Sequence, residues 1–175
     1  MTFQEIKQIL ILQFGPENID SIETGLQPSI VVPAGKLAEV GQFLHENEQL
    51  YFDFLACITA IDNGPGLATM ELIYNFTSIP YGHNLVLKII FPRNINDQTL
   101  PSVSTLSNIW KTADWHEREA FDLVGIHFNG HPDLRRILLP EDWEGHPLRK
   151  DYHQQEQYHG IYVKYEDGNS NSDRV

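Results

Sequence analysis

The chain has 175 residues, and its 24 acidic residues against 12 basic ones give a formal net charge of −12, which disfavours binding to nucleic acid or adsorption to anionic lipid. Hydrophobic residues make up 41% of the chain, enough for the core of one compact domain with an appendage. No apolar run approaches the ~20 residues that span a bilayer, and the N-terminus lacks a secretory signal, so we expect a soluble, cytoplasmic protein.

The first elements carry clear boundary signals. Thr2 and Glu5 have the spacing of a capping box, and Gly15 followed by proline predicts the end of this first helix. Two short strands, Ile19–Ile22 and Ser29–Val32, are then expected around a turn at Gly25.

A second helix is predicted to begin at Pro33, because proline suits the first turn of a helix. Its buried face has the spacing i, i+3, i+4, i+7 and consists of Leu37, Val40, Gly41 and Leu44. Gly41 is expected to allow close packing on a sheet.

Three further strands are predicted at Tyr51–Ile61, Ala68–Phe76 and Asn84–Phe91. The last is apolar on both faces apart from Lys88, so we expect it at the centre of the sheet. The loop Gly64-Pro65-Gly66 has glycines like a dinucleotide-binding turn, but a strand follows it rather than a helix, so a hairpin loop is the better interpretation.

The chain has one cysteine, Cys57, which limits the cysteine-based redox centres that it can form. A lone cysteine cannot build an iron–sulfur cluster or a disulfide framework. Because Cys57 lies in the apolar run Leu55–Ile61, we expect it to be buried and unreactive. The pair His127 and His131 has the spacing of a helical zinc site, but Gly130 and Pro132 disfavour that helix.

A third helix is expected from about Ser104 to Val124, with Gly125 as its C-cap. Its apolar stripe contains Val103, Leu106, Trp110, Ala113, Ala120, Phe121 and Val124. The predicted fold is therefore α+β, a mixed sheet with helices packed on one face. We expect an α+β domain over 1–126, then an ordered extended segment over 127–152, which we call the arm, and a flexible polar tail over 153–175.

Charged residues on the third helix form two groups. Asp114, Arg118 and Asp122 are spaced i, i+4, i+8 and predict an exposed salt-bridge ladder. Glu117 lies on the apolar stripe, where a carboxylate is costly without a partner. We therefore hypothesise that Glu117 anchors the arm through an arginine, with Arg135, Arg136 and Arg149 as candidates. Glu117 and Glu119 point to different sides of a helix, so paired acid–base catalysis is disfavoured.

The residues from Glu117 to Tyr152 resemble a known signature. Glu117-Arg118-Glu119, Asp122-Leu123-Val124, His131, Arg135 and Ile137-Leu138, followed without a gap by residues 138–152, are similar to the C-subunit family of complex I, a respiratory NADH:quinone oxidoreductase. Family members often have proline after the Lys-Asp-Tyr of the signature, whereas this chain has His153.

The resemblance implies a cofactor-free, non-catalytic scaffold subunit in the hydrophilic arm of the complex, peripheral on the cytoplasmic side of the inner membrane. Its partners would be other hydrophilic-arm subunits, chiefly the large quinone-site subunit, and NADH, FMN, iron–sulfur clusters and quinone would be held elsewhere. Because the chain ends soon after the signature, we expect the version that is not fused to the large subunit. The residues expected to serve docking or structure are Glu117, Arg118, Glu119, Asp122, His131, Arg135, Arg136, Trp143, Arg149, Lys150, Asp151 and Tyr152.

Two alternatives inside the family remain open, the equivalent J-subunit of the photosynthetic ferredoxin-fed complex and the related component of a membrane-bound hydrogenase. A free-standing enzyme that uses the carboxylates of the third helix and a stand-alone binding module are the alternatives outside it.

Overall fold

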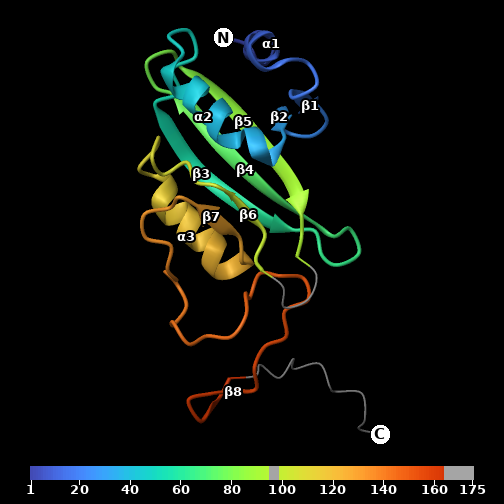
Figure 1. Cartoon of the computed structure of the whole chain (residues 1–175), viewed down its shortest axis with the longest axis vertical. Helices are drawn as coiled ribbons and strands as arrows, with labels where there is room; N and C mark the ends of the chain where they lie inside the picture. The colour runs from blue at the N-terminus through green and yellow to red at the C-terminus, as the bar shows by residue number, and fades with distance from the viewer. Residues whose placement is uncertain (95–98, 164–175) are drawn as a thin grey trace, which may run out of the picture.

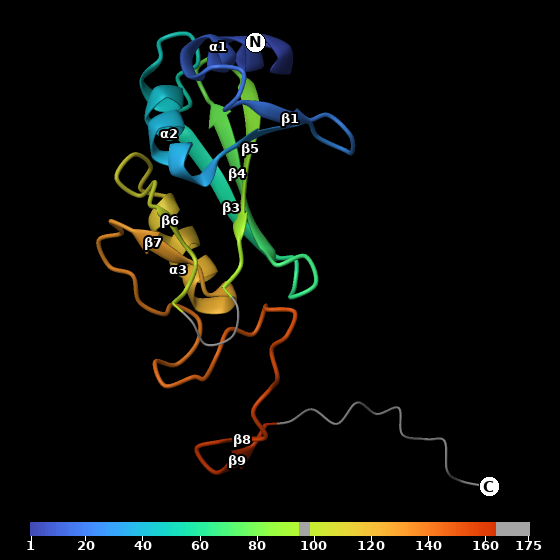
Figure 2. The same ribbon diagram turned by 45° about the vertical axis from the view of Figure 1, so that its right-hand side comes forward.

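The computed structural model describes residues 1–94 and 99–163, which form an α+β fold around a five-stranded mixed sheet (Figure 1). In chain order the elements are α1 (Phe3–Phe14), β1 (Asp20–Ile22), β2 (Ser29–Val32), the 3-10 helix η1 (Ala34–Lys36), α2 (Leu37–Glu46), β3 (Phe54–Asp62), β4 (Thr69–Ser78), β5 (His83–Pro92), β6 (Ser102–Ser104), α3 (Ala113–Val124), β7 (His127–Asn129), β8 (Gln157–Tyr158) and β9 (Ile161–Tyr162). The sheet order is β1-β2-β5-β4-β3, with β2 and β5 parallel and the other neighbours antiparallel. Figure 2 shows α2 and α3 on the same side of this sheet, which confirms the predicted fold class.

The N-terminal elements follow the predicted boundaries. Thr2 and Glu5 form the capping box, in which the Glu5 amide donates to the Thr2 hydroxyl at 3.3 Å and the Thr2 amide donates to the Glu5 carboxylate at 2.7 Å. Gly15 caps the other end of α1. Pro33 precedes the short helix η1, which leads into α2, instead of opening α2 itself.

The sheet buries one face under the helices. On β4 the residues Met70, Leu72, Tyr74 and Phe76 are at most 1% exposed, and they alternate with half-buried residues as predicted. Strand β5 lies between β2 and β4, so its expected central position is confirmed. The loop at 63–68 joins β3 to β4 and is a hairpin loop, as predicted.

The predicted helix from Ser104 to Val124 is wrong in its first half. Residues 102–104 form β6, which pairs with β7, and turns follow until α3 begins at Ala113. The Thr105 hydroxyl accepts a hydrogen bond from the Ser107 amide at 3.0 Å, a local bond that competes with helix formation. The stripe residues Leu106 and Trp110 are buried all the same, so burial was predicted correctly and the local conformation was not.

Two further expectations need correction. Gly41 does permit close packing, but a Cβ there would lie 3.0 Å from Leu106 and 3.4 Å from Trp110, so the close neighbour is the turn segment and not the sheet. Cys57 is half-buried rather than buried, and the side-chain Nδ2 of Asn75 donates to its sulfur at 3.2 Å.

The arm begins inside the domain and then leaves it. Strand β7 pairs in parallel with β6, and its Phe128 belongs to the core. Beyond β7 the chain runs past α3 without regular structure until the two-stranded hairpin of β8 and β9 (Figure 2). The part of the expected polar tail from residue 164 onward lies outside the described residues.

Candidate docking site

Helix α3 carries two completely buried carboxylates, Glu117 and Asp122, in different surroundings. Ala113, Glu117, Ala120 and Val124 form the buried stripe of the helix, which lies against β3. Asp122 faces the arm instead, where it bonds residues 136–139. The helix therefore connects the core of the domain on one side to the arm on the other.

Asp122 organises the first half of the arm. Its Oδ1 accepts from Nη1 of Arg136 at 2.7 Å, and its Oδ2 accepts from the amides of Ile137, Leu138 and Leu139 at 3.1, 2.8 and 2.9 Å. Burial acts to raise the pKa of Asp122, but these hydrogen bonds outweigh burial and lower it below its usual value. An ionised Asp122 thus satisfies amides that have no partner in a helix or sheet.

The C-terminus of α3 is closed by the second half of the arm. Arg149 donates from Nε to the Val124 carbonyl at 2.8 Å and from Nη2 to the Gly125 carbonyl at 2.9 Å. Nδ1 of His146 donates to the Asp122 carbonyl at 2.9 Å. The last carbonyls of a helix lack partners within it and attract positive charge, so Arg149 is well suited to this position. Gly125 has a φ of 74°, the left-handed conformation of a C-cap glycine, as predicted.

The end of the arm is attached to the sheet through a further buried carboxylate, Asp62, the last residue of β3. Its Oδ1 accepts from Nε of Arg93 at 2.8 Å and from the Gly64 amide at 3.0 Å, while its Oδ2 accepts from the Lys150 amide at 2.8 Å. Arg93 also pairs with Asp151 of the arm. Burial acts to raise the pKa of Asp62, but the hydrogen bonds and the charge of Arg93 lower it.

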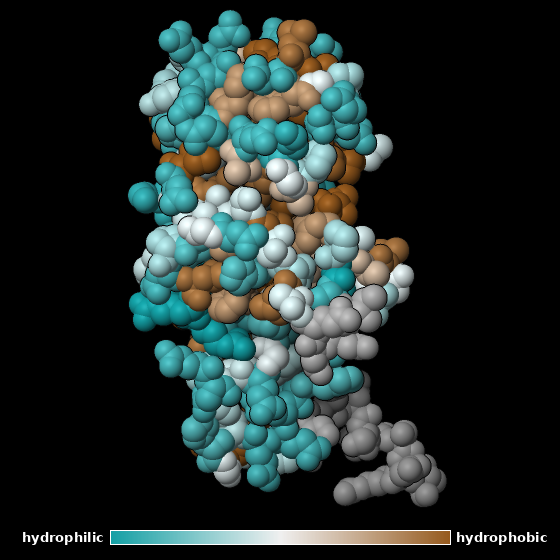
Figure 3. Space-filling view, viewed as in Figure 1, coloured by the Kyte–Doolittle hydropathy of each residue, from teal (hydrophilic) through white to brown (hydrophobic). Residues whose placement is uncertain are grey.

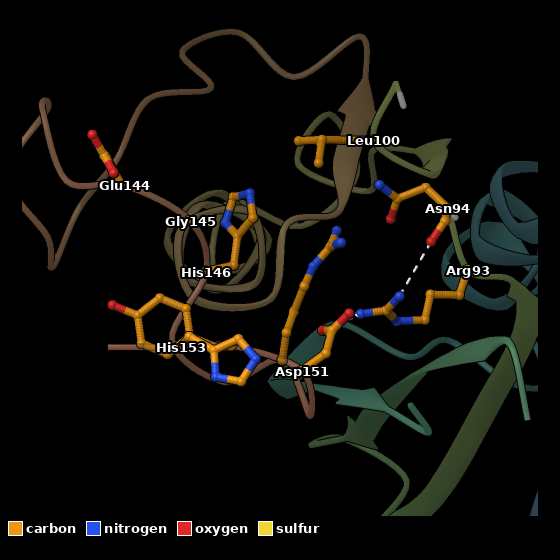
Figure 4. A pocket seen from close by; sticks show the side chains of 10 residues that line it. Arg93, Asn94, Leu100, Glu144, Gly145, His146, Asp151 and His153 are labelled. Carbon is orange, nitrogen blue, oxygen red and sulfur yellow. Dashed lines mark hydrogen bonds and ion pairs between the residues drawn. The ribbon is translucent and has the colours of Figure 1, made fainter. Parts of the chain in front are cut away.

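A pocket of about 490 Å³ lies between the arm and the strand end at Arg93 (Figure 4). His146 and Asp151 line it from the arm, His153 lines it just beyond the arm, and Arg93 and Asn94 line it from the sheet side. Its arginines, Arg93 and Arg149, are already bonded to carboxylates or carbonyls, so the polar groups around the pocket mainly hold the arm in place.

Glu117 is buried as predicted, but the hypothesis that it anchors the arm through an arginine is wrong. Its carboxylate accepts from the Thr105 hydroxyl and, at 2.7 Å, from the Leu106 amide, both in the turn after β6. Burial raises the pKa of Glu117 to about 7, against the opposing effect of these two hydrogen bonds. The carboxylate of this helix that forms an ion pair with an arginine of the arm is Asp122, five residues after Glu117, and its partner is Arg136.

The predicted ladder of Asp114, Arg118 and Asp122 is also absent, since in the described residues Arg118 donates to the carbonyls of Arg135 and Arg136 at 3.3 and 3.2 Å. His131 lies beside the same helix, with Nε2 3.1 Å from the Asp114 carbonyl.

The remaining residues of the expected docking set lie at separate places on α3 and the arm. Arg135 is exposed and pairs with Asp133 at 3.0 Å, and Glu119 is exposed on α3. Nε1 of Trp143 donates to the Tyr152 hydroxyl at 3.2 Å, which links two points of the arm. Lys150 contributes its backbone amide to Asp62 rather than its charge.

Sequence reasoning missed Asp62, Arg93 and Thr105. Asp62 ends an apolar strand. The antiparallel order of β3, β4 and β5 brings this end of β3 close to the end of β5, just before Arg93. A charged residue at the end of each of these two strands is a pattern in the sequence that could have predicted this pair. Thr105 gave none, because the sequence placed it inside a helix.

No helix among residues 1–94 and 99–163 combines the length and apolar character needed to cross a bilayer. A solved structure from the membrane-bound sulfane sulfur reductase, an archaeal respiratory membrane complex, shares the fold, with a TM-score of 0.69 over 86% of this chain and 85% of that chain at 23% identity.

Sequence comparison is more specific. The family model described as respiratory-chain NADH dehydrogenase, 30 Kd subunit, matches residues 30–158, and the chain therefore belongs to this family. The NADH-quinone oxidoreductase C-subunit of Chloroherpeton thalassium is 42% identical over 167 residues, which cover 94% of this chain and 65% of the relative. The corresponding proteins of Chlorobium phaeobacteroides and Geobacter sulfurreducens are 43% and 38% identical, covering 77% and 80% of this chain and 78% and 83% of themselves. The chain thus spans just under two thirds of the Chloroherpeton relative.

Proposed function

We propose that this chain is a cofactor-free scaffold subunit in the hydrophilic arm of a proton-translocating NADH:quinone oxidoreductase, and that residues 127–152 dock it to the subunit that forms the quinone site. Family membership supports the assignment to an NADH:quinone oxidoreductase complex. The arrangement of the arm supports the docking role.

The observation that carries the proposal is how the arm is held. Asp122 of α3 accepts hydrogen bonds from the backbone amides of residues 137–139. This part of the arm is therefore held in place although it forms no helix or strand. Leu138 and Leu148 point outward and are 62% and 59% exposed. The helix holds this extended segment on one side, and its apolar side chains point away from the helix. Such a preorganised surface lowers the entropy cost of binding a partner.

The surface around these leucines is mostly polar. In Figure 3 the lower part of the molecule, which the arm and residues 153–163 form, is predominantly hydrophilic, with apolar residues gathered over the domain above it. Many interfaces between subunits have this composition, a few apolar anchors within a polar surround. The proposed interface is therefore anchored at few points and depends on the arm keeping its shape.

The chemistry of the chain supports the proposed cofactor-free role. A single cysteine cannot ligate an iron–sulfur cluster alone, and the glycine-rich loop at 64–66 connects two strands, where no helix N-terminus is available for a phosphate. NADH, FMN, the clusters and quinone would then be bound by other subunits. This arrangement fits a peripheral position on the cytoplasmic side of the inner membrane.

The test is copurification of the complex from native membranes in mild detergent, with tagged wild-type chain and the variant Leu138→Asp. We expect the wild type to recover the other hydrophilic-arm subunits and the variant to recover far fewer. Leu67→Asp is the matched control, because Leu67 is 71% exposed in the β3–β4 loop and does not belong to the arm. Equal recovery by both variants contradicts docking through the arm, and substrate turnover by the purified chain alone contradicts the scaffold role.

The J-subunit of the photosynthetic complex and the hydrogenase component are the alternatives within the family. The relatives from Chloroherpeton, Chlorobium and Geobacter are named as components of NADH-quinone oxidoreductase, which favours the respiratory complex. Genes for the NADH-oxidising subunits beside this one would support that choice, and hydrogenase or ferredoxin-linked genes would contradict it.

A further inference from the structure

The two edges of the five-stranded sheet differ in how well they are protected. Edge strands expose unpaired backbone groups, and proteins usually shorten them, charge them or cover them. β1 is a three-residue strand that begins with Asp20, so it is both short and charged. β3 has nine residues, contains no proline, and carries no charge before Asp62 at its end.

Only the first part of the β3 edge is covered by the described chain. The Thr112 hydroxyl donates to the Leu55 carbonyl at 2.8 Å, and the Trp110 indole donates to the Phe52 carbonyl at 2.8 Å just before the strand. A bulge at Ala56 follows. From residue 57 to 61, β4 is the only hydrogen-bonded neighbour of the β3 backbone within residues 1–94 and 99–163.

A groove of about 150 Å³ runs beside this uncovered stretch, between β3 and the C-terminal half of α3. Thr59 and Ala60 line it from the strand, Glu119 and Leu123 from the helix, and Leu148 from the arm. A groove of this volume has room for one side chain about as large as a benzene ring. The lining has one charged side chain, Glu119, which is exposed.

We propose that residues 57–61 of β3 pair with an extended segment of a different protein subunit, which adds a strand to the sheet. Main-chain hydrogen bonds supply affinity in this mode of recognition, and side-chain pockets supply specificity. The added strand places an apolar side chain in the groove and a lysine or arginine beside Glu119. A second copy of this chain is disfavoured as the occupant, because each copy has a net charge of −12 and the two would repel.

This inference rests on the proposed place in a multisubunit complex, but it concerns the β3 edge and its groove, which share only Leu148 with the outward side of the arm. The measurement is amide hydrogen exchange of the full-length chain, alone and in the copurified complex. Alone, the outward-facing amides of residues 57–61 are expected to exchange rapidly. In the complex their exchange slows by roughly tenfold or more, as expected for newly paired strand amides.

The variant Thr59→Lys tests the same edge, because a lysine on an edge strand opposes pairing. It is expected to abolish the slowing of exchange at 57–61. Asn84→Lys is the control, since Asn84 is an exposed residue of β5, an interior strand of the same sheet.

Three results overturn the inference: exchange at 57–61 that is equally fast in the complex, exchange that is already slow in the isolated chain, or slowing that appears with chain concentration in the absence of other subunits. If no subunits copurify, the proposed function fails as well. If they copurify while residues 57–61 exchange rapidly, only strand addition fails.

Discussion

Asp122 of α3 and Arg136 of the arm form an ion pair of 2.7 Å, in which the Asp122 side chain is completely buried and the Arg136 side chain is 17% exposed. The same carboxylate accepts from the amides of residues 137–139. One helix residue therefore fixes the path of a segment that has no helix or strand of its own.

Asp122→Asn is expected to release this segment from the helix. The amide side chain lacks the charge that balances Arg136 and can accept fewer hydrogen bonds, and breaking a buried pair costs about 3–5 kcal/mol. Limited proteolysis should show faster cleavage between residues 130 and 145. Glu119→Gln, an exposed carboxylate of the same helix, is the control and should leave cleavage unchanged. Equal cleavage of wild type and Asp122→Asn would show that Asp122 does not hold the arm.

The raised pKa of Glu117 predicts an unusual dependence of the free energy of unfolding on pH. Burial raises its pKa from 4.5 to about 7, so the folded state favours the protonated form. The contribution of Glu117 to stability is therefore fully present below pH 4.5 and declines as the pH rises to about 7, by about 3 kcal/mol. Asp114, His131 and Tyr74 are ionisable side chains that lie near it.

Denaturant unfolding of wild type and Glu117→Gln at several pH values isolates this effect. Subtraction cancels the other carboxylates, so the variant should gain about 3 kcal/mol relative to wild type between pH 4.5 and 7. A difference that stays constant across this range would mean that Glu117 keeps its usual pKa.

Gly125→Ala is expected to separate the arm from the end of α3. A Cβ at this position would lie 2.5 Å from the His146 ring and 2.7 Å from Nη2 of Arg149. The left-handed conformation costs roughly a further 1 kcal/mol for alanine.

Gly82→Ala distinguishes these two causes, because Gly82 has a φ of 64° but no neighbour within 4 Å of its would-be Cβ. Thermal unfolding should show a larger loss for Gly125→Ala than for Gly82→Ala. Equal losses would mean that the backbone conformation alone matters and that the arm does not pack on Gly125.

Arg93→Met is expected to free the end of the arm from the sheet. Arg93 is 5% exposed in its side chain and lies between Asp62 and Asp151, so its removal leaves Asp62 as an uncompensated buried charge at a cost of about 3–5 kcal/mol. Arg135→Met, which breaks the exposed pair with Asp133, should change the free energy of unfolding by less than ~1 kcal/mol. Equal effects in a denaturant titration would argue against a structural role for the Asp62–Arg93 pair.

Sequence patterns determined most of the domain. The capping box at Thr2, the buried face of α2, the alternation on β4 and the central position of β5 all depend on local periodicity, which the chain records directly. The burial of Glu117 followed from the same periodicity. Family membership also follows from sequence, through the long signature from Glu117 to Tyr152 and the match over residues 30–158.

Tertiary structure alone decided which carboxylate serves the arm and where the helix begins. Glu117 and Asp122 lie about 1.4 turns of helix apart, so they face different neighbours, and only the path of the arm shows that Asp122 meets Arg136 while Glu117 meets Thr105. The segment at 105–112 has helical spacing but forms turns, because β6 pairs with β7 and the Thr105 hydroxyl bonds the Ser107 amide. Long-range pairing and hydrogen bonds between distant residues leave no periodic trace in the sequence, so only the folded chain determines how the arm is attached.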